Sequence, residues 1–143
     1  MTSPFARHAS RLGEWCRHHM AALLSTALDF LVMIGVVEIF AASAAVATGI
    51  GAAFGGACNF QLGRHFTYGA TYAKTGDQAL RYALVSIASL GLNAAGEHAV
   101  VQFTPVHYVL GRIVVAFLIS NLWNYPMQKH FVFSRVAPRP ERA

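Results

Sequence analysis

The sequence predicts an all-α integral membrane protein, a four-helix bundle built from a duplicated two-helix hairpin. Of the 143 residues, 55% are hydrophobic and only 12% are charged, against about 25% charged in an average soluble domain. The apolar residues fall in four long runs, and the ends of the second and fourth runs repeat each other. A soluble domain of this size needs a charged surface, which this chain cannot provide.

Each apolar run is close to the ~20 residues that a helix needs to cross a bilayer. The first two runs meet with almost no polar loop, but a single helix through both would be about twice as long as a bilayer is thick. The last two are separated by a turn that contains Pro105, which a continuous helix would not tolerate. The predicted membrane helices cover residues 20–42, 44–62, 81–103 and 108–127.

The two ends of the chain are polar and basic. Residues 1–19 are predicted to form a basic cytoplasmic segment, in which 10–19 make a short amphipathic helix on the membrane surface. Residues 134–143, with two prolines among arginines, are predicted to be a disordered cytoplasmic tail. The apolar stretch 20–42 is longer than the core of a signal peptide, roughly 7–15 residues, so it is predicted to be retained.

Basic residues predict the orientation in the membrane. The net charge is +5, and ten of the eleven Lys and Arg residues lie in the N-terminal segment, around the middle loop, or after the fourth run. The positive-inside rule puts that side, and both termini, in the cytoplasm of a multi-pass inner-membrane protein. The charge is then expected to contact anionic lipid head groups, and we expect no nucleic-acid binding.

The repeat is clearest where the second and fourth runs end. Residues 59–68 read N-F-Q-L-G-R-H-F-T-Y and residues 124–133 read N-Y-P-M-Q-K-H-F-V-F, at an offset of 65. At an offset of 64, Ser25 matches Ser89 and Asp29 matches Asn93. General enrichment of aromatic and basic residues at a membrane interface would explain part of this pattern, but not the matched Asn, His and spacing. Two units that enter and leave on the same side should be related by an axis along the membrane normal.

These motifs, their order and their spacing resemble the GtrA family of small four-helix membrane proteins over about residues 20–134. Arg64-His65-Phe66 stands where the family usually has a Trp or similar residue, which is a mild departure. The resemblance implies translocation of a polyprenyl-phosphate-linked sugar from the cytoplasmic to the outer leaflet, for cell-surface polysaccharide synthesis or glycosylation. Four short helices enclose little space for such a lipid, so we expect a homodimer or a complex with a membrane glycosyltransferase.

Polar and charged residues inside membrane helices are the candidates for the site, because each is costly there. Ser86, Ser89, Asn93 and Glu97 lie on one face of the third helix, and Asn121, Asn124 and Gln128 lie on one face of the fourth. These faces can line a sugar site or simply join helices, at about 0.6 kcal/mol per hydrogen bond. The predicted substrate-binding residues are Asp29, Asn59, Arg64, Ser89, Asn93, Glu97, Arg112, Asn121, Asn124 and Lys129.

Charged candidates each have a structural alternative. Arg112 is expected to pair with Glu38 or Glu97, for structural or functional reasons. Arg64 and Lys129 occupy equivalent repeat positions at the cytoplasmic interface, where they can bind a lipid phosphate or anchor to head groups in general. Asp29 can serve substrate or proton binding, or helix packing.

Glycines and missing motifs complete the prediction. The GxxxG pattern of residues 51–55 predicts a close-packing face, within the monomer or between protomers. The chain has no Gly-rich phosphate loop, no metal-ligand cluster and no triad, so we expect no enzyme, metal or cofactor. Two other functions stay open. One is a non-transporting accessory subunit of a glycosyltransferase, and the other is a small proton-coupled multidrug exporter that uses Asp29.

Overall fold

The computed structural model describes residues 4–134, with the side chains of 10–43, 46–107 and 110–134. The chain divides into two compact units, Met1–Thr71 and Tyr72–Ala143, whose described parts we call the first hairpin (4–71) and the second hairpin (72–134). Within residues 4–134 every regular element is a helix. The predicted disordered tail lies, beyond Ser134, outside the described residues.

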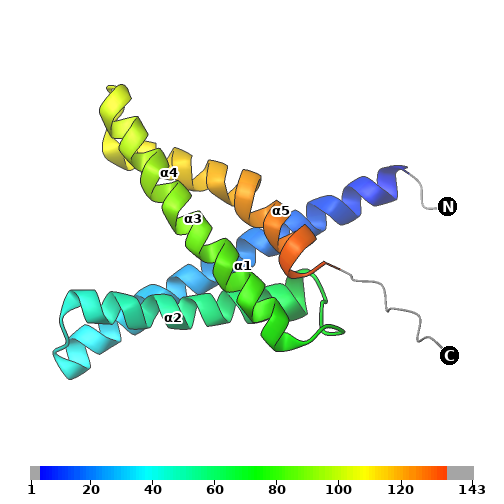
Figure 1. The fold of residues 1–143 in the computed structure, drawn as a ribbon, viewed down its shortest axis with the longest axis horizontal. Coiled ribbons are helices and arrows are strands. Elements are labelled where there is room, and N and C mark those ends of the chain that lie inside the picture. The colour runs from blue at the N-terminus through cyan, green and yellow to red at the C-terminus, as the bar shows by residue number, and fades with distance from the viewer. Residues whose placement is uncertain (1–3, 135–143) are drawn as a thin grey trace. The chain divides into compact units, whose positions relative to one another are not determined.

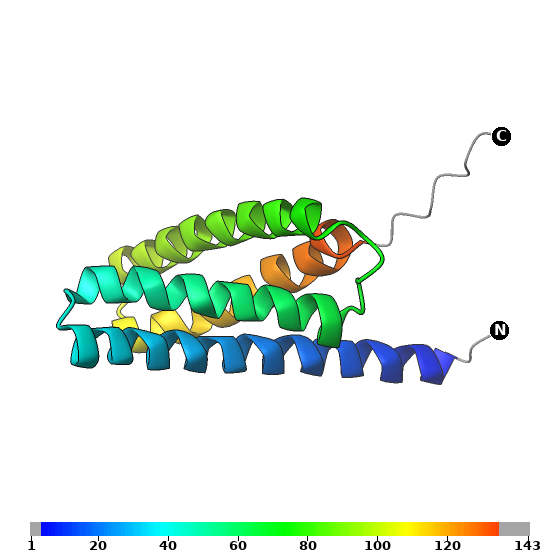
Figure 2. The same cartoon turned by 90° about the horizontal axis from the view of Figure 1, so that it is seen from below.

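The first hairpin consists of α1 (Pro4–Phe40) and α2 (Ala44–Leu62), and a π-helical turn, η1 (Gly63–Thr67), extends α2. The two helices run antiparallel and side by side (Figures 1 and 2). Ala41 reverses the chain with a φ of 51°. Ser43 then caps α2, because its hydroxyl accepts a hydrogen bond from the Val46 N–H at 3.5 Å.

Helix α1 is longer than the sequence analysis predicted. No separate surface helix ends at His19, because α1 is continuous from Pro4 to Phe40. Neither Pro nor β-branched residues interrupt the stretch 10–25, and the run Met20–Leu24 consists of strong helix formers. His18 also ties this stretch to the end of the hairpin, since its Nδ1 lies 3.0 Å from the Tyr68 hydroxyl. The boundary drawn from polarity was therefore not a break in the backbone.

Glycines bring α1 and α2 together. A Cβ added at Gly51 would lie 2.5 Å from both the backbone oxygen and the carboxylate Oδ1 of Asp29. One added at Gly55 would lie 2.8 Å from the Ser25 carbonyl oxygen. Such distances are impossible for a real side chain, so only glycine permits this approach. The predicted GxxxG packing face is confirmed, and it lies within the first hairpin.

The second hairpin begins with α3 (Thr75–Phe103), which starts earlier than the predicted Arg81. Asp77 lies in its first turn, where a carboxylate interacts favourably with the helix dipole. At the other end, Thr104 donates its hydroxyl hydrogen to the Val100 carbonyl at 2.7 Å, and Pro105 follows. The chain then turns into the returning helix.

That returning helix is made of α4 (Tyr108–Ile119), the π-helical turn η2 (Ser120–Asn124), α5 (Tyr125–Met127) and a second π-helical turn, η3 (Gln128–Val132). It continues past Met127, where the apolar run ended. Pro126 lies inside it and cannot donate a backbone hydrogen bond. The π-helical register of η2 just before the proline is a known way to absorb such a disruption.

The second hairpin is closed at both ends. Near the turn, Gly96 approaches Val115 and Gly111 approaches Val100; a Cβ on these glycines would lie 2.7 and 2.5 Å from the valine methyls. At the opposite end, Arg81 donates to the Phe131 carbonyl at 3.2 Å. Tyr72 also donates there, to the Phe133 carbonyl at 3.1 Å. The middle of this hairpin lies between these two closed ends.

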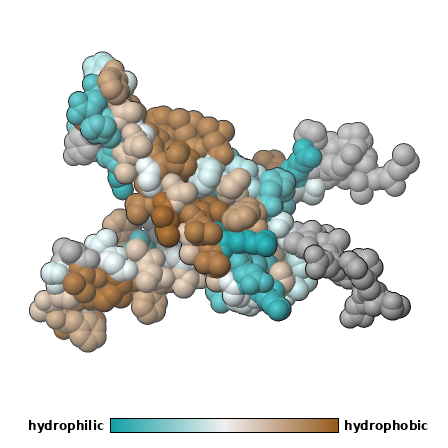
Figure 3. Space-filling view, viewed as in Figure 1, coloured by the Kyte–Doolittle hydropathy of each residue, from teal (hydrophilic) through white to brown (hydrophobic). Residues whose placement is uncertain are grey.

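The helices turn large apolar side chains outward. Exposed fractions reach 72% for Leu23, 75% for Ile39, 72% for Leu90 and 84% for Phe103. Figure 3 shows hydrophobic residues over α4, with hydrophilic residues near the two ends of the second hairpin. Among the described residues, Ser10–Phe40 and Thr75–Phe103 are long and apolar enough to cross a membrane. An apolar surface of this extent is suited to lipid rather than water.

Candidate functional site

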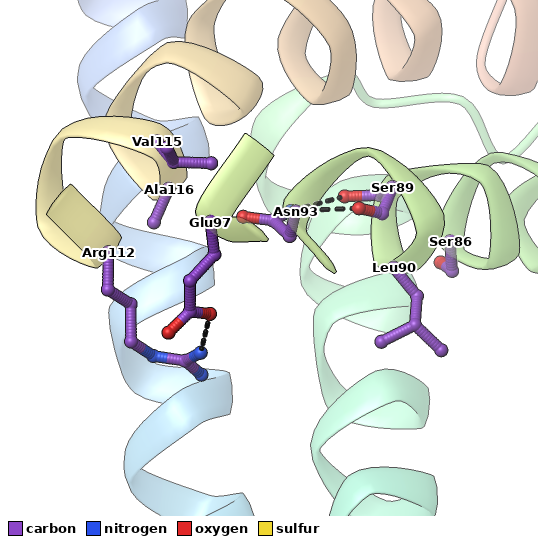
Figure 4. Close-up of a pocket in the computed structure, with 8 residues that line it drawn as sticks. All are labelled: Ser86, Ser89, Leu90, Asn93, Glu97, Arg112, Val115 and Ala116. Atoms are coloured by element: carbon purple, nitrogen blue, oxygen red, sulfur yellow. Dashed lines mark hydrogen bonds and ion pairs between the residues drawn. The ribbon is translucent and has the colours of Figure 1, made fainter. Parts of the chain in front are cut away.

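An open pocket of about 320 Å³ lies between α3 and α4 of the second hairpin (Figure 4). Its wall from α3 carries the stripe of polar residues that the sequence analysis placed on one face. Its wall from α4 carries Arg112 and two small apolar residues. The lining residues are Ser86, Ser89, Leu90, Asn93, Glu97, Arg112, Val115 and Ala116.

Asn93 is oriented by its own helix. Its side-chain amide donates to the Ser89 carbonyl at 2.8 Å and lies 3.4 Å from the Ser89 hydroxyl. Both contacts join Asn93 to the residue one turn earlier in α3, as Figure 4 shows. Within the described part of the chain, the carbonyl oxygen Oδ1 of Asn93 has no such partner, so it remains an acceptor for a ligand hydroxyl.

Arg112 and Glu97 close one end of the pocket with an ion pair. The guanidinium Nη1 lies 2.7 Å from the Glu97 oxygen Oε2, as the dashed line in Figure 4 shows. The predicted pairing of Arg112 with Glu38 or Glu97 is confirmed, and the partner is Glu97 on α3. A guanidinium stays charged at any accessible pH, so in a membrane it requires a compensating anion.

The apolar side of the pocket was not foreseen from the sequence. Val115 is 7% exposed and fixes the spacing of the helices where it meets Gly96. Ala116 lines the pocket one residue further on. The repeat offers the signal that would have found it, because Ala116 is the counterpart of Gly51 at the offset of 65. The larger residue stands where the first hairpin has its close contact.

Three predicted site residues belong to the first hairpin and not to this pocket. Asp29 lies partly exposed in α1, against Gly51. Asn59 lies in α2. Arg64 is 8% exposed in η1, and its Nη2 donates to the Thr71 carbonyl at 3.2 Å. Arg64 therefore holds the loop that follows η1, whatever else it binds.

Three others lie beyond the pocket in the second hairpin. Asn121 and Asn124 are in η2, and the Asn121 amide donates to the Phe117 carbonyl at 2.8 Å. Lys129 lies in η3, where its Nζ donates to the Tyr125 hydroxyl at 3.3 Å. Among the residues lining the pocket, the predicted ones are thus Ser89, Asn93, Glu97 and Arg112.

The repeated sequence ends have the same backbone form. The π-helical turns η1 and η3 cover Gly63–Thr67 and Gln128–Val132, which is the repeat offset of 65. Each is closed by the next aromatic residue, with Tyr68 N–H donating to the Gly63 oxygen at 2.9 Å and Phe133 N–H to the Gln128 oxygen at 2.8 Å. A rare turn at matched positions shows that the two hairpins share local structure as well as sequence.

Residues 17–133 match the family described as GtrA/DPMS, transmembrane domain. The chain belongs to this family. The match covers most of both hairpins and both repeated ends, and it identifies the chain as a membrane protein of polyprenyl-sugar-related processes. Searches of curated proteins and of solved structures gave no match.

Proposed function

We propose that this GtrA/DPMS-family chain moves a polyprenyl-phosphate-linked sugar across the cytoplasmic membrane, for surface polysaccharide synthesis or glycosylation. The observation that carries the proposal is the pocket of the second hairpin. It combines hydroxyl, amide, carboxylate and guanidinium groups on helices that otherwise expose apolar side chains. A sugar needs hydrogen-bonding partners of this kind, and lipid tails do not supply them.

The two ends of the pocket offer different chemical groups to a ligand. Ser86, Ser89 and Asn93 offer hydroxyl and amide groups for neutral sugar hydroxyls. Glu97 and Arg112 offer charge at the other end. The apolar wall, which includes Leu90 and Ala116, suits the carbon skeleton of a sugar ring or the first part of the lipid chain.

The proposed membrane orientation and partners rest on the distribution of charge and on the small size of the chain. Ten of the eleven Lys and Arg residues fall on one predicted side, which supports an inner-membrane protein with cytoplasmic termini. Arg64 and Lys129, beside the repeated turns, would meet anionic phosphate at that interface. One chain encloses little space, so a homodimer or a complex with a membrane glycosyltransferase would complete the path. The chain itself acts without catalysis.

The test measures transfer between the leaflets of liposomes that contain the purified full chain and a labelled polyprenyl-phosphate sugar. Asn93→Ala and Ser89→Ala should each slow transfer about tenfold, as expected if one ligand hydrogen bond of about 1.4 kcal/mol is lost. Ala116→Leu should slow it further by filling the pocket. Ser25→Ala is the matched control, because Ser25 is the counterpart of Ser89 in the first hairpin and does not line the pocket.

The outcomes separate the functions. Transfer that depends on Ser89 and Asn93 but not on Ser25 supports the proposal. Absence of transfer by a folded chain that binds a membrane glycosyltransferase would refute it and leave the accessory-subunit function. Proton-driven efflux of cationic drugs that depends on Asp29 would instead identify an exporter.

A further inference from the structure

The ion pair at the end of the pocket uses only a small part of the hydrogen-bonding capacity of Arg112. The guanidinium has five N–H donors arranged to grip two oxygens at once. Within the described residues, its side chain forms one hydrogen bond, from Nη1 to the Glu97 oxygen Oε2 at 2.7 Å. The Arg112 side chain is 71% exposed and that of Glu97 is 31% exposed.

This geometry differs from that of a pair built for structure. A structural pair in lipid is expected to be two-pronged and enclosed, so that both charges are satisfied. Here most of the guanidinium remains open at the rim of a pocket. Figure 4 shows the carboxylate and the guanidinium meeting end to end from α3 and α4, apart from the Asn93 and Ser89 end of the pocket.

We propose that Arg112 binds the phosphate group of a lipid ligand, and that Glu97 is the anion that occupies this place while the site is empty. The proposal rests on the proposed function for the identity of the lipid. The two non-bridging oxygens of a phosphate ester, which share its negative charge, can both accept from the guanidinium, whereas Glu97 accepts through one oxygen in this structure. When phosphate arrives, it replaces Glu97 as the counter-ion of Arg112, and the displaced Glu97 carboxylate is hydrated at the open rim of the pocket.

The neighbouring residues fit the rest of the ligand. Asn93 lies one helical turn from Glu97 along α3, about 6 Å at 1.5 Å per residue. That is about the distance from a phosphate to the far side of the first sugar ring attached to it. Asn93 lines the pocket there, and Ser89 lines it one further turn along α3. Arg112 therefore binds the phosphate, and Asn93 and Ser89 bind the sugar.

A competing anion predicts a distinctive mutant. Glu97→Gln removes the competitor and leaves Arg112 without a counter-ion, so it should lower the melting temperature of the empty protein and tighten phosphate binding about tenfold or more. Arg112→Gln should weaken binding by at least about the same factor. The double variant Glu97→Gln with Arg112→Gln keeps a polar contact but has no charge. It should bind polyprenyl phosphate no more tightly than polyprenyl alcohol.

The experiment uses the full chain in nanodiscs of zwitterionic lipid and measures the affinity and the thermal shift produced by polyprenyl phosphate, with polyprenyl alcohol as the uncharged probe. Glu38→Gln is the matched control. It removes one carboxylate from the first hairpin, and Glu38 has no ion pair among the described residues. A parallel arm with phosphatidylglycerol distinguishes a polyprenyl phosphate from the phosphate of bulk lipid. An Arg112-dependent shift with polyprenyl phosphate or with phosphatidylglycerol, but not with polyprenyl alcohol, supports the phosphate site.

Two results would overturn the proposal. One is equal affinity for phosphate and alcohol in the wild type. The other is a Glu97→Gln variant that is destabilised but binds phosphate no more tightly, as a purely structural pair requires. These results are independent of the transfer assay. Binding that depends on Arg112 without any transfer would refute the proposed function alone, and transfer that ignores Glu97 and Arg112 would refute the phosphate site alone.

Discussion

The two hairpins use the same pair of repeat positions in opposite ways. In the first hairpin, Asp29 and Gly51 touch so closely that no side chain fits between the helices. In the second hairpin, their counterparts Asn93 and Ala116 both border the pocket. One hairpin is closed at its middle and the other is open there.

Small differences between the repeats explain this contrast. Gly51 and Gly55 become Ala116 and Ser120, which add side-chain volume where α2 has none. Close contacts in the second hairpin instead involve Gly96 and Gly111, near the turn. The two copies of the duplicated hairpin thus differ at their middles, where one is tightly packed and the other has a pocket. The position of the glycines therefore decides which hairpin is closed at its middle and which has a pocket there.

The largest expected effect comes from forcing the closed hairpin open. Gly51→Val places branched carbon atoms against the backbone and carboxylate of Asp29, and overpacking without room to relax costs about 3 kcal/mol or more. We expect a steep loss of monodisperse protein and of melting temperature in detergent. Gly49→Val is the control, because nothing lies within 4 Å of a Cβ added at Gly49.

Equal melting temperatures for the Gly51→Val and Gly49→Val variants would contradict the close contact. Ala116→Val, at the matching position of the second hairpin, sharpens the comparison. It should fold nearly as well as the wild type, because Ala116 borders open space in the pocket.

An intermediate effect is expected from the two basic residues of the repeated turns. Arg64 is buried at 8% exposure and donates to the Thr71 carbonyl, whereas Lys129 is half-buried and contacts the Tyr125 ring and hydroxyl. Loss of a hydrogen bond from a charged group costs about 1.5–3 kcal/mol. Arg64→Met should therefore destabilise the protein by about this amount, and Lys129→Met by less than about 1 kcal/mol.

Thermal unfolding of the two methionine variants in the same detergent measures this difference. A larger loss of stability for Lys129→Met than for Arg64→Met would contradict this prediction. It would mean that the second turn, rather than the first, depends on its basic residue for stability.

How far the sequence predicts this molecule depends on the kind of feature. Hydrophobic runs and the repeat predicted an all-helical membrane protein of four helices, and the spacing of Ser86, Ser89, Asn93 and Glu97 predicted one polar face. That these four residues share one face of α3 follows from helical periodicity alone. The partner of Arg112 was narrowed to two glutamates, because depth can be estimated from helix length.

Other features depend on information that a polarity pattern lacks. The continuation of α1 through His19 depends on local helix propensity and on the contact between His18 and Tyr68, and polarity reports neither. The π-helical turns depend on backbone register near Pro126 and at the ends of the helices. The pocket depends on where two helices separate, which is set by Val115, Gly96 and Gly111 rather than by any polar residue.

The smallest expected effect on stability concerns one further pair of matched positions at which the two hairpins differ. Trp123 donates its indole N–H to the Val85 carbonyl at 3.2 Å and so links η2 to α3. Its counterpart in the first hairpin is Cys58, which has no comparable donor. Trp123→Phe keeps an aromatic ring and removes the donor, so it should cost about 1 kcal/mol. A shift of a few degrees in the melting temperature, with normal purification behaviour, would match this value. An unchanged melting temperature would mean that the open hairpin is held by its two closed ends alone, and that the indole serves packing rather than hydrogen bonding.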